Sequence, residues 1–209
     1  MRVIDVNFDP KELLRAGYDA IASRYADWAA AVDSPAMEFV CKLSSRIPAG
    51  SDVLDIGCGS GVFARELSQR HQVTGIDLSA VQIELARRNV PEATFINADV
   101  RELELAPASF DAAVALYLLL HVPRREHAAI LAKIAAWLRP GGLFLATMGA
   151  GKGEAVEEWL GVQLLMGCRN EPPPCSRGRS SAVEGRRHRA ARARTRSRAA
   201  SLGVRTEAG

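Results

Sequence analysis

The sequence predicts an α/β fold in which a doubly wound parallel sheet is covered by helices on both faces. Apolar runs of strand length alternate with helical segments between residues 51 and 147. A glycine-rich turn at residues 57–61 directly follows the first run, at the edge where such a sheet places its ligand. The longest apolar run, residues 112–120, is too short to span a bilayer and is typical of a buried strand and its exit.

Composition predicts one ordinary domain, because 209 residues with 48% hydrophobic content can bury a single core. The N-terminus carries Asp5 and Asp9 and lacks the unbroken apolar stretch of a signal peptide. The cysteines show no disulfide or metal-ligand spacing and stand at Cys41, Cys58, Cys168 and Cys175. We therefore expect free thiols, a cytoplasmic location, no metal site and no membrane partner.

The formal net charge of +3 hides two different compositions. Residues 1–159 hold 16 Lys and Arg against 21 Asp and Glu, whereas residues 160–209 hold 11 Arg, no Lys and 3 Glu. We expect a helical cap over residues 1–50, the sheet domain over residues 51–161, and a disordered Arg-rich tail over residues 162–209. The tail has no aromatic residue and little apolar periodicity, so burial cannot offset its chain entropy.

Two helices are predicted before the sheet begins. The first starts with a capping box at residues 9–12, which places a proline in the first turn. One face of this helix, at helical spacing, consists of Tyr18, Ile21, Ala22 and Tyr25. The second helix starts at Ser34 and ends before Pro48.

Strands and helices then alternate along the chain. Strands are predicted at residues 52–56, 72–77, 93–97, 111–117 and 143–147. Helices are predicted at residues 62–70 and 79–89, and before the turn at residues 139–142, where Ile130, Ile134 and Leu138 mark the core side. Repeated units of this size give a parallel sheet of five strands.

The turn after the first strand has the composition of a nucleotide-type site. Its glycines permit a tight turn, a close approach of backbone to ligand, and close packing of helix on strand. A glycine-rich turn alone is common in strand–helix units. Asp77, however, follows Gly57 by twenty residues, at the end of the next strand, where a carboxylate can accept from both ribose hydroxyls.

The details of the turn argue against a dinucleotide. Counted from Gly57, a dinucleotide fingerprint needs a glycine or alanine where this chain has Val62. Asp55, two residues before the first glycine, would repel a pyrophosphate and suits a ligand with an ammonium and a sulfonium group. Together with the lack of a catalytic Tyr–Lys or His constellation, this disfavours a nicotinamide-dependent dehydrogenase.

Five motifs stand in register along the chain. They are Val-Leu-Asp-Ile-Gly-Cys-Gly-Ser-Gly at residues 53–61, Gly-Ile-Asp-Leu-Ser at 75–79, Asn-Ala-Asp at 97–99, Ser-Phe-Asp at 109–111 and Leu-Arg-Pro-Gly-Gly at 138–142. In order and spacing they resemble the signature motifs of the class I S-adenosylmethionine-dependent methyltransferases. The resemblance covers roughly residues 18–159 and implies a Rossmann-like domain.

The resemblance implies a role for each matching position. Gly57 and Gly59 would line the methionine part of the cofactor, and Asp55 would lie near its ammonium group. Asp99 would accept from the adenine amino group, beside the Val100 amide. Asp77 would hold the ribose, and the tyrosines of the first helix would close over the cofactor. The full expected set is Tyr18, Tyr25, Asp55, Gly57, Cys58, Gly59, Gly61, Asp77, Leu78, Asp99 and Val100.

Some residues have two interpretations. Tyr18 and Tyr25 fit core packing nearly as well as a lid over the cofactor. Asp111 stands at the start of its strand, away from the ligand edge, so a structural role is expected. His121 follows the fourth strand and is the candidate general base or acceptor-pocket residue, although a lone histidine is more often structural.

The expected function is transfer of a methyl group from S-adenosylmethionine to an N, O or C atom of a small molecule. The family continues after its fifth strand with a helix and a β-hairpin, and here that continuation breaks off after residue 161. We hypothesise a frameshift near residues 162–167, which would leave the hairpin missing and give a truncated, catalytically impaired homologue. The alternative is an RNA methyltransferase with a basic tail; the missing lysines and aromatic residues and the acidic domain argue against nucleic acid.

Overall fold

The computed structural model describes residues 9–32, 34–149 and 153–169. Its centre is a sheet of five strands in the order β3-β2-β1-β4-β5, in which all neighbours are parallel. The strands are β1 Asp52–Ile56, β2 Gln72–Asp77, β3 Thr94–Asn97, β4 Phe110–Ala115 and β5 Leu138–Ala146. This confirms the predicted doubly wound sheet. The strand order reverses between β1 and β4, which places a ligand-binding crevice at their carboxyl ends.

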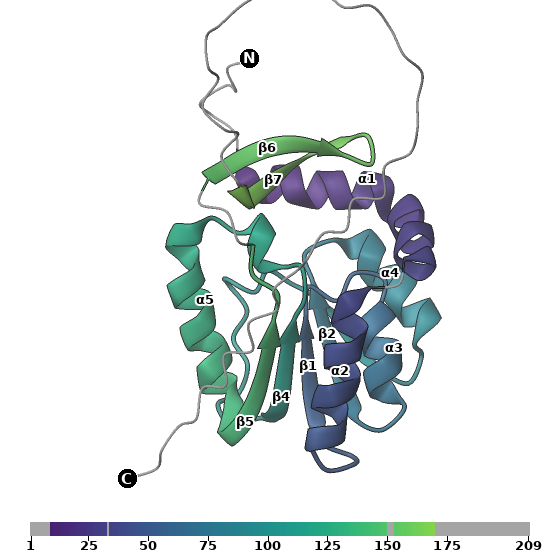
Figure 1. Ribbon diagram of the computed structural model, residues 1–209, viewed down its shortest axis with the longest axis vertical. Coiled ribbons are helices and arrows are strands. Elements are labelled where there is room, and N and C mark those ends of the chain that lie inside the picture. Colours follow the sequence, from purple (N-terminus) through teal and green to yellow (C-terminus); the bar gives the residue numbers. More distant parts are fainter. Residues whose placement is uncertain (1–8, 33, 150–152, 170–209) are drawn as a thin grey trace, which may run out of the picture.

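Helices cover both faces of the sheet, because alternate residues of each strand point to opposite sides. One core contains Val53 and Val73 of the strands with helices α2 Pro35–Arg46, α3 Val62–Ser68 and α4 Ala80–Asn89. The other core contains Leu54 and Ile56 with helix α5 Arg124–Trp137 and the chain after β3. Figure 1 shows α5 apart from α2, α3 and α4, on the other side of the sheet.

Local hydrogen bonds explain where the helices begin. Helix α1 Pro10–Ala31 starts after Asp9, whose side chain accepts from the Lys11 amide at 2.9 Å. Helix α4 starts after Ser79, whose Oγ accepts from the Gln82 amide at 3.1 Å. These side chains pair amides that the first helical turn leaves free, so both predicted starts are confirmed.

Asp111 has the structural role that its position predicts. Its carboxylate accepts from the Asp52 amide at 2.8 Å and forms an ion pair with Arg139 at 2.8 Å. Arg139 also contacts the Asp52 carboxylate at 2.9 Å. The three residues tie β1, β4 and β5 together at the amino edge of β1 and β4, opposite the ligand edge.

A β-hairpin follows the sheet, and here the predicted boundary at residue 162 is wrong. Strands β6 Gly153–Trp159 and β7 Val162–Arg169 pair antiparallel as a separate two-stranded sheet. The hairpin lies beside α1, across the end of the main sheet (Figure 1). The five-stranded sheet therefore ends at β5, but the chain continues in regular structure to residue 169.

Long-range packing explains why β7 forms. Leu164 is 0% exposed, and a Cβ atom on Gly17 of α1 would lie only 2.6 Å from its Cδ2. A Cβ on Gly167 would lie 3.3 Å from the carbonyl oxygens of Leu120 and Val122. Strand β7 is thus held between α1 and the chain after β4. The rest of the predicted tail, residues 170–209, lies outside the described residues.

Candidate functional site

A cavity lies at the carboxyl ends of β1, β2 and β4, under helix α1. It holds about 910 Å³ of free space, part of which is open solvent. Nine of the predicted site residues line it: Tyr18, Tyr25, Gly57, Gly59, Asp77, Leu78, Asp99, Val100 and His121. We call this the cofactor cavity. The remaining three predicted residues, Asp55, Cys58 and Gly61, do not line it.

The glycine turn needs residues without side chains. Gly57 and Gly59 have φ angles of +74° and +52°, in the left-handed region that other residues rarely adopt. A Cβ atom on Gly57 would lie 3.2 Å from Leu118, and one on Gly59 would lie 3.3 Å from the Tyr25 ring. Glycine keeps this backbone open to the cavity, as close approach of a ligand requires.

Asp77 stands between the turn and helix α4. One carboxylate oxygen accepts from the Gly59 amide and the other from the Ser79 amide, both at 2.9 Å. Burial raises the pKa of Asp77, although these amides oppose the shift. Each oxygen keeps a second lone pair on the wall of the cavity, so the carboxylate can still accept from two hydroxyl groups.

Asp55 is buried behind the glycine turn, with 1% of its surface exposed. The Ala64 amide of helix α3 hydrogen-bonds its carboxylate, but Oδ2 has no hydrogen-bond partner among the described residues. Burial, with the nearby charge of Asp77, raises the pKa of Asp55 to about 7. Since Asp55 lies behind the turn and not in the cavity wall, its carboxylate would act on a cationic ligand group through its charge, without direct contact.

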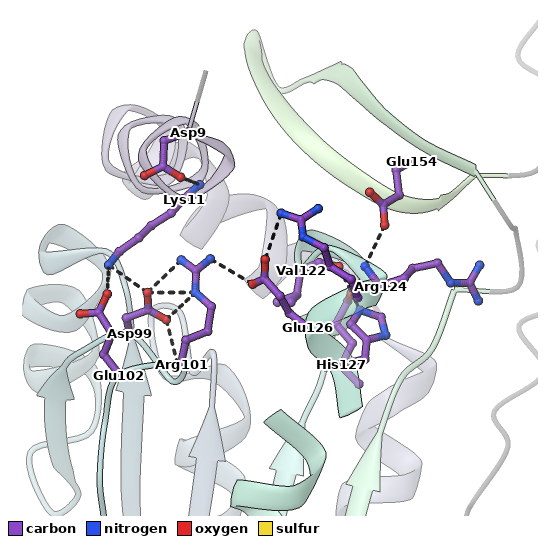
Figure 2. Close-up of polar contacts among 12 residues, drawn as sticks. Asp9, Lys11, Asp99, Arg101, Glu102, Val122, Arg124, Glu126, His127 and Glu154 are labelled. Atoms are coloured by element: carbon purple, nitrogen blue, oxygen red, sulfur yellow. Dashed lines mark hydrogen bonds and ion pairs between the residues drawn. The ribbon is translucent and has the colours of Figure 1, made fainter. Parts of the chain in front are cut away.

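Two cations hold Asp99, and no sequence motif pointed to either of them. Lys11 of α1 lies 3.0 Å from its carboxylate, and Arg101 lies 2.8 Å from it (Figure 2). Burial acts to raise the pKa of Asp99, but hydrogen bonds from Arg101 and Lys11 hold it below its ordinary value. Lys11 also contacts Glu102 at 2.7 Å. These contacts fasten the start of α1 to the loop after β3.

His121 joins three parts of the site. Its Nδ1 lies 2.8 Å from the Leu165 carbonyl oxygen of β7, and its Nε2 lies 2.8 Å from the Tyr18 hydroxyl of α1. A carbonyl only accepts, so Nδ1 carries the proton and Nε2 accepts from Tyr18. Burial lowers the pKa of His121 to about 4, which keeps the ring neutral at pH 7. This geometry fits a residue that positions α1 and the hairpin.

Aromatic rings of α1 and of the hairpin pack together beside the cavity. The ring centroids of Tyr18 and Tyr25 are 5.4 Å apart, and Tyr25 and Trp28 are 5.9 Å apart. Trp159 at the end of β6 lies 5.2 Å from Trp28 and 5.7 Å from Tyr25. Trp159 was not predicted as a site residue, since only the hairpin's fold brings it to α1.

Cys58 and Gly61 have different surroundings. Cys58 is buried and lines a neighbouring cavity, and burial raises the pKa of its thiol well above the ordinary value, so it is an unreactive thiol. A Cβ on Gly61 would lie 3.1 Å from Val90 and 3.4 Å from Ala86, so this glycine allows close packing of helix on strand. Within the described residues, no group of His, Cys, Asp or Glu could hold a metal ion.

Comparisons with known proteins give a family match and related methyltransferases. A family described as "Methyltransferase domain" matches residues 53–142. An O-methyltransferase of Pyrenophora dematioidea is 41% identical over 100 residues, which cover 44% of this chain and 37% of the relative. A ubiquinone biosynthesis O-methyltransferase of Idiomarina loihiensis is 32% identical over 167 residues, covering 74% of this chain and 65% of the relative. The chain thus spans less than two thirds of the length of these curated relatives.

Solved structures give the same result. A TehB-like SAM-dependent methyltransferase from Corynebacterium glutamicum superposes with a TM-score of 0.58 and 25% identity, covering 72% of this chain and 96% of that one. The DhpI–SAH complex gives a TM-score of 0.59 and 25% identity, covering 78% and 82%. No helix among the described residues could cross a membrane by its length and hydropathy. Residues 53–142 therefore form a domain of the class I methyltransferases, a family whose cofactor is S-adenosylmethionine.

Proposed function

We propose that the chain transfers the methyl group of S-adenosylmethionine to a small molecule. The observation that carries this proposal is the cofactor cavity, in which the glycine turn, Asp77 and Asp99 line one continuous wall. The buried, unpaired oxygen of Asp55 beside the turn supports a cofactor with an ammonium group. The expected roles of these residues follow the family resemblance: Asp77 on the ribose, Asp99 beside the adenine, and Asp55 near the ammonium.

The protein's own contribution is mainly positioning. When bound, the cofactor would supply a sulfonium methyl group, whose carbon would bond to the acceptor atom while the electrons of the broken carbon–sulfur bond stay on sulfur and the acceptor's proton leaves to solvent water. Holding two reactants in line can contribute up to about 7–11 kcal/mol. Helix α1 and the hairpin meet beside the cavity, where the rings of Tyr18, Tyr25 and Trp159 pack together.

A labelled-methyl assay tests the proposal. The purified chain is incubated with S-adenosylmethionine and a panel of small phenols, amines and carbon acids, and transferred label is counted. Asp77→Ala should lose roughly tenfold or more in cofactor affinity, because the ribose hydroxyls lose their acceptor. Asp111→Ala, which removes a carboxylate at the other edge of β4, should keep that affinity. Cofactor binding without transfer to any acceptor would favour an impaired homologue, and equal affinity in both variants would exclude the proposed site.

A further inference from the structure

A second cavity adjoins the cofactor cavity and has no role so far. Its lining shares Tyr25, Gly57, Leu116 and Tyr117 with the cofactor cavity, so the two meet where β1 and β4 diverge. It encloses about 670 Å³, part of it open to solvent. A small molecule placed there would lie next to the glycine turn and beside a cofactor in the first cavity.

The walls of the two cavities differ in charge. The cofactor cavity is lined by Lys11, Arg15, Asp77, Asp99 and Arg101. None of the described residues that line the second cavity is charged, and its apolar wall consists mainly of Trp28, Val32, Pro35 and Phe63. A charged molecule would lose its hydration there without gaining a counter-ion from these described residues, which is costly. A flat apolar molecule would stack on the rings.

Polar groups stand at defined points in this apolar wall. The hydroxyls of Ser34 and Tyr117 lie 3.0 Å apart. Ser60 is 2% exposed, and its Oγ has no hydrogen-bond partner among the described residues. A buried, unpaired hydroxyl is uncommon and points to a ligand that supplies the missing partner.

Tyr117 stands on the boundary between the cavities in a strained conformation. It follows the end of β4 with φ of +59°, a value that is rare for a residue with a side chain. Its amide donates to the Thr147 Oγ1 at 2.6 Å, and its ring lies 6.4 Å from that of Phe63. Contacts from α2, α3 and the end of β5 thus hold a strained residue at the site, a pattern typical of ligand clamps.

We propose that the second cavity binds the methyl acceptor and selects an uncharged, planar, mainly apolar molecule with a hydroxyl group, of the naphthol or phenol type. The rings of Trp28 and Phe63 take the flat body, and the Tyr117 hydroxyl pairs with the acceptor's hydroxyl. Tyr117 is then a specificity-determining residue for the reaction. This inference rests on the proposed function, because it places the acceptor relative to the cofactor cavity.

Three matched probes test the selectivity by calorimetry: 2-naphthol, which is neutral, 2-naphthoate, which is an anion, and 2-naphthylmethylamine, which is a cation. Each is titrated into the full chain at pH 7, with and without saturating S-adenosylhomocysteine. We expect 2-naphthol to bind and each charged probe to bind at least about tenfold more weakly. Charged probes that bind as tightly as 2-naphthol, or a naphthol that does not bind while S-adenosylhomocysteine does, would overturn the inference.

Two variants of matched chemistry locate the binding. Val32 is 39% exposed and lines the second cavity, whereas Val81 of α4 is 38% exposed and lines neither cavity. Val32→Trp should fill the cavity and weaken 2-naphthol about tenfold or more, and Val81→Trp should leave its affinity unchanged. Both variants should still bind S-adenosylhomocysteine. Equal naphthol affinity in the two variants would place the probe elsewhere.

Tyr117→Phe tests the polar contact without emptying the cavity. With S-adenosylhomocysteine held saturating, loss of one neutral hydrogen bond should weaken 2-naphthol by about two- to tenfold. Unchanged naphthol affinity would remove Tyr117 from the proposal. If the wild-type chain fails to bind S-adenosylhomocysteine at all, the proposed function falls; if it binds the cofactor product but not the naphthol, only the inference about the acceptor falls.

Discussion

Burial shifts the pKa values of two side chains at the ligand edge of the sheet in opposite directions. Burial raises the pKa of Asp55 to about 7 and lowers the pKa of His121 to about 4. Both residues therefore favour the neutral form in the absence of ligand. A ligand that carries a cation can stabilise the ionised form of Asp55, so the site is better suited to an ammonium-bearing cofactor than to an anionic one.

Asp55→Asn should change how stability depends on pH. The folded-state pKa of about 7 lies above the ordinary value of 3.8, so the folded chain holds this proton more tightly and loses stability as pH rises from about 4 to 7. Asparagine has no such titration. The stability of the variant relative to wild type should therefore increase by about 4 kcal/mol over this window and level off above it. Urea unfolding at several pH values measures the slope; a constant difference would contradict the burial argument.

His121→Phe should act on stability in the opposite pH direction. The pKa of His121 is depressed, so its contribution is complete above its ordinary value of 6.5 and is lost as pH falls through about 4. At pH 7 the variant should be roughly 2–4 kcal/mol less stable, because the Tyr18 hydroxyl and the Leu165 carbonyl lose their partner. That deficit should shrink toward pH 4. A large loss of turnover with unchanged unfolding free energy would instead assign His121 as the general base.

At the scale of elements, α1 and the β6–β7 hairpin form one cover over the site. Leu164 of β7 packs on Gly17 of α1, and His121 hydrogen-bonds to both elements. Lys11 then fastens the start of α1 to Asp99 at the wall of the cofactor cavity. Because these contacts share α1, a change in the hairpin should reach the cofactor cavity.

Leu164→Ala tests whether the hairpin is a packed part of the fold. Removing a fully buried leucine should cost about 2–5 kcal/mol of unfolding free energy and weaken cofactor binding through α1. The exposed residue Val81 on α4 supplies the control, since Val81→Ala should cost less than about 0.5 kcal/mol. A Leu164 variant as stable as this control would mean that residues 162–169 contribute nothing to the fold.

The sequence predicted the elements whose signals are local. Helix starts at Asp9 and Ser79 follow from side-chain caps, and the strands β1 to β4 follow from apolar runs of the right length. The strand β5 begins at Leu138 rather than at residue 143, because it pairs with Phe110 across an irregularity in the ladder. Strand β7 was missed because its burial depends on Gly17, which lies far away in the sequence.

The same distinction between local signals and long-range contacts applies to the site residues. Motif spacing was enough to predict that Gly57, Gly59 and Asp77 lie close together, and they line one cavity. Their roles toward a cofactor stay predictions. Lys11 and Trp159 were not predictable, because their partners Asp99 and Trp28 stand about ninety and more than one hundred residues away. Such contacts form only once α1 and the hairpin fold onto the sheet.

At the scale of the whole chain, the acidic residues 1–159 differ in composition from the Arg-rich residues 160–209. Residues 170–209 contain ten of the chain's arginines and lie outside the described residues. Leu164 and Gly167 are packed in the fold, which argues against a frameshift near residues 162–167. The alternative of an RNA-binding tail concerns residues 170–209.

Ending the chain at Arg169 should leave cofactor affinity within about twofold, since the described residues that line the cavity and form its cover all lie before residue 170. Calorimetry on the shortened and full chains makes the comparison. If the tail binds RNA, the full chain should show an RNA affinity that falls steeply with salt and disappears on truncation. Absence of any such affinity in the full chain would remove the RNA alternative.

The central claim is that the cavity under α1 holds S-adenosylmethionine and excludes a dinucleotide. Calorimetric titration of the full chain with S-adenosylhomocysteine and, separately, with NAD at pH 7 tests it most directly. The glycine turn without a third small residue at Val62, and the carboxylate of Asp55 behind it, predict that S-adenosylhomocysteine binds and that NAD binds at least about tenfold more weakly. NAD binding as tight as or tighter than S-adenosylhomocysteine would contradict the claim.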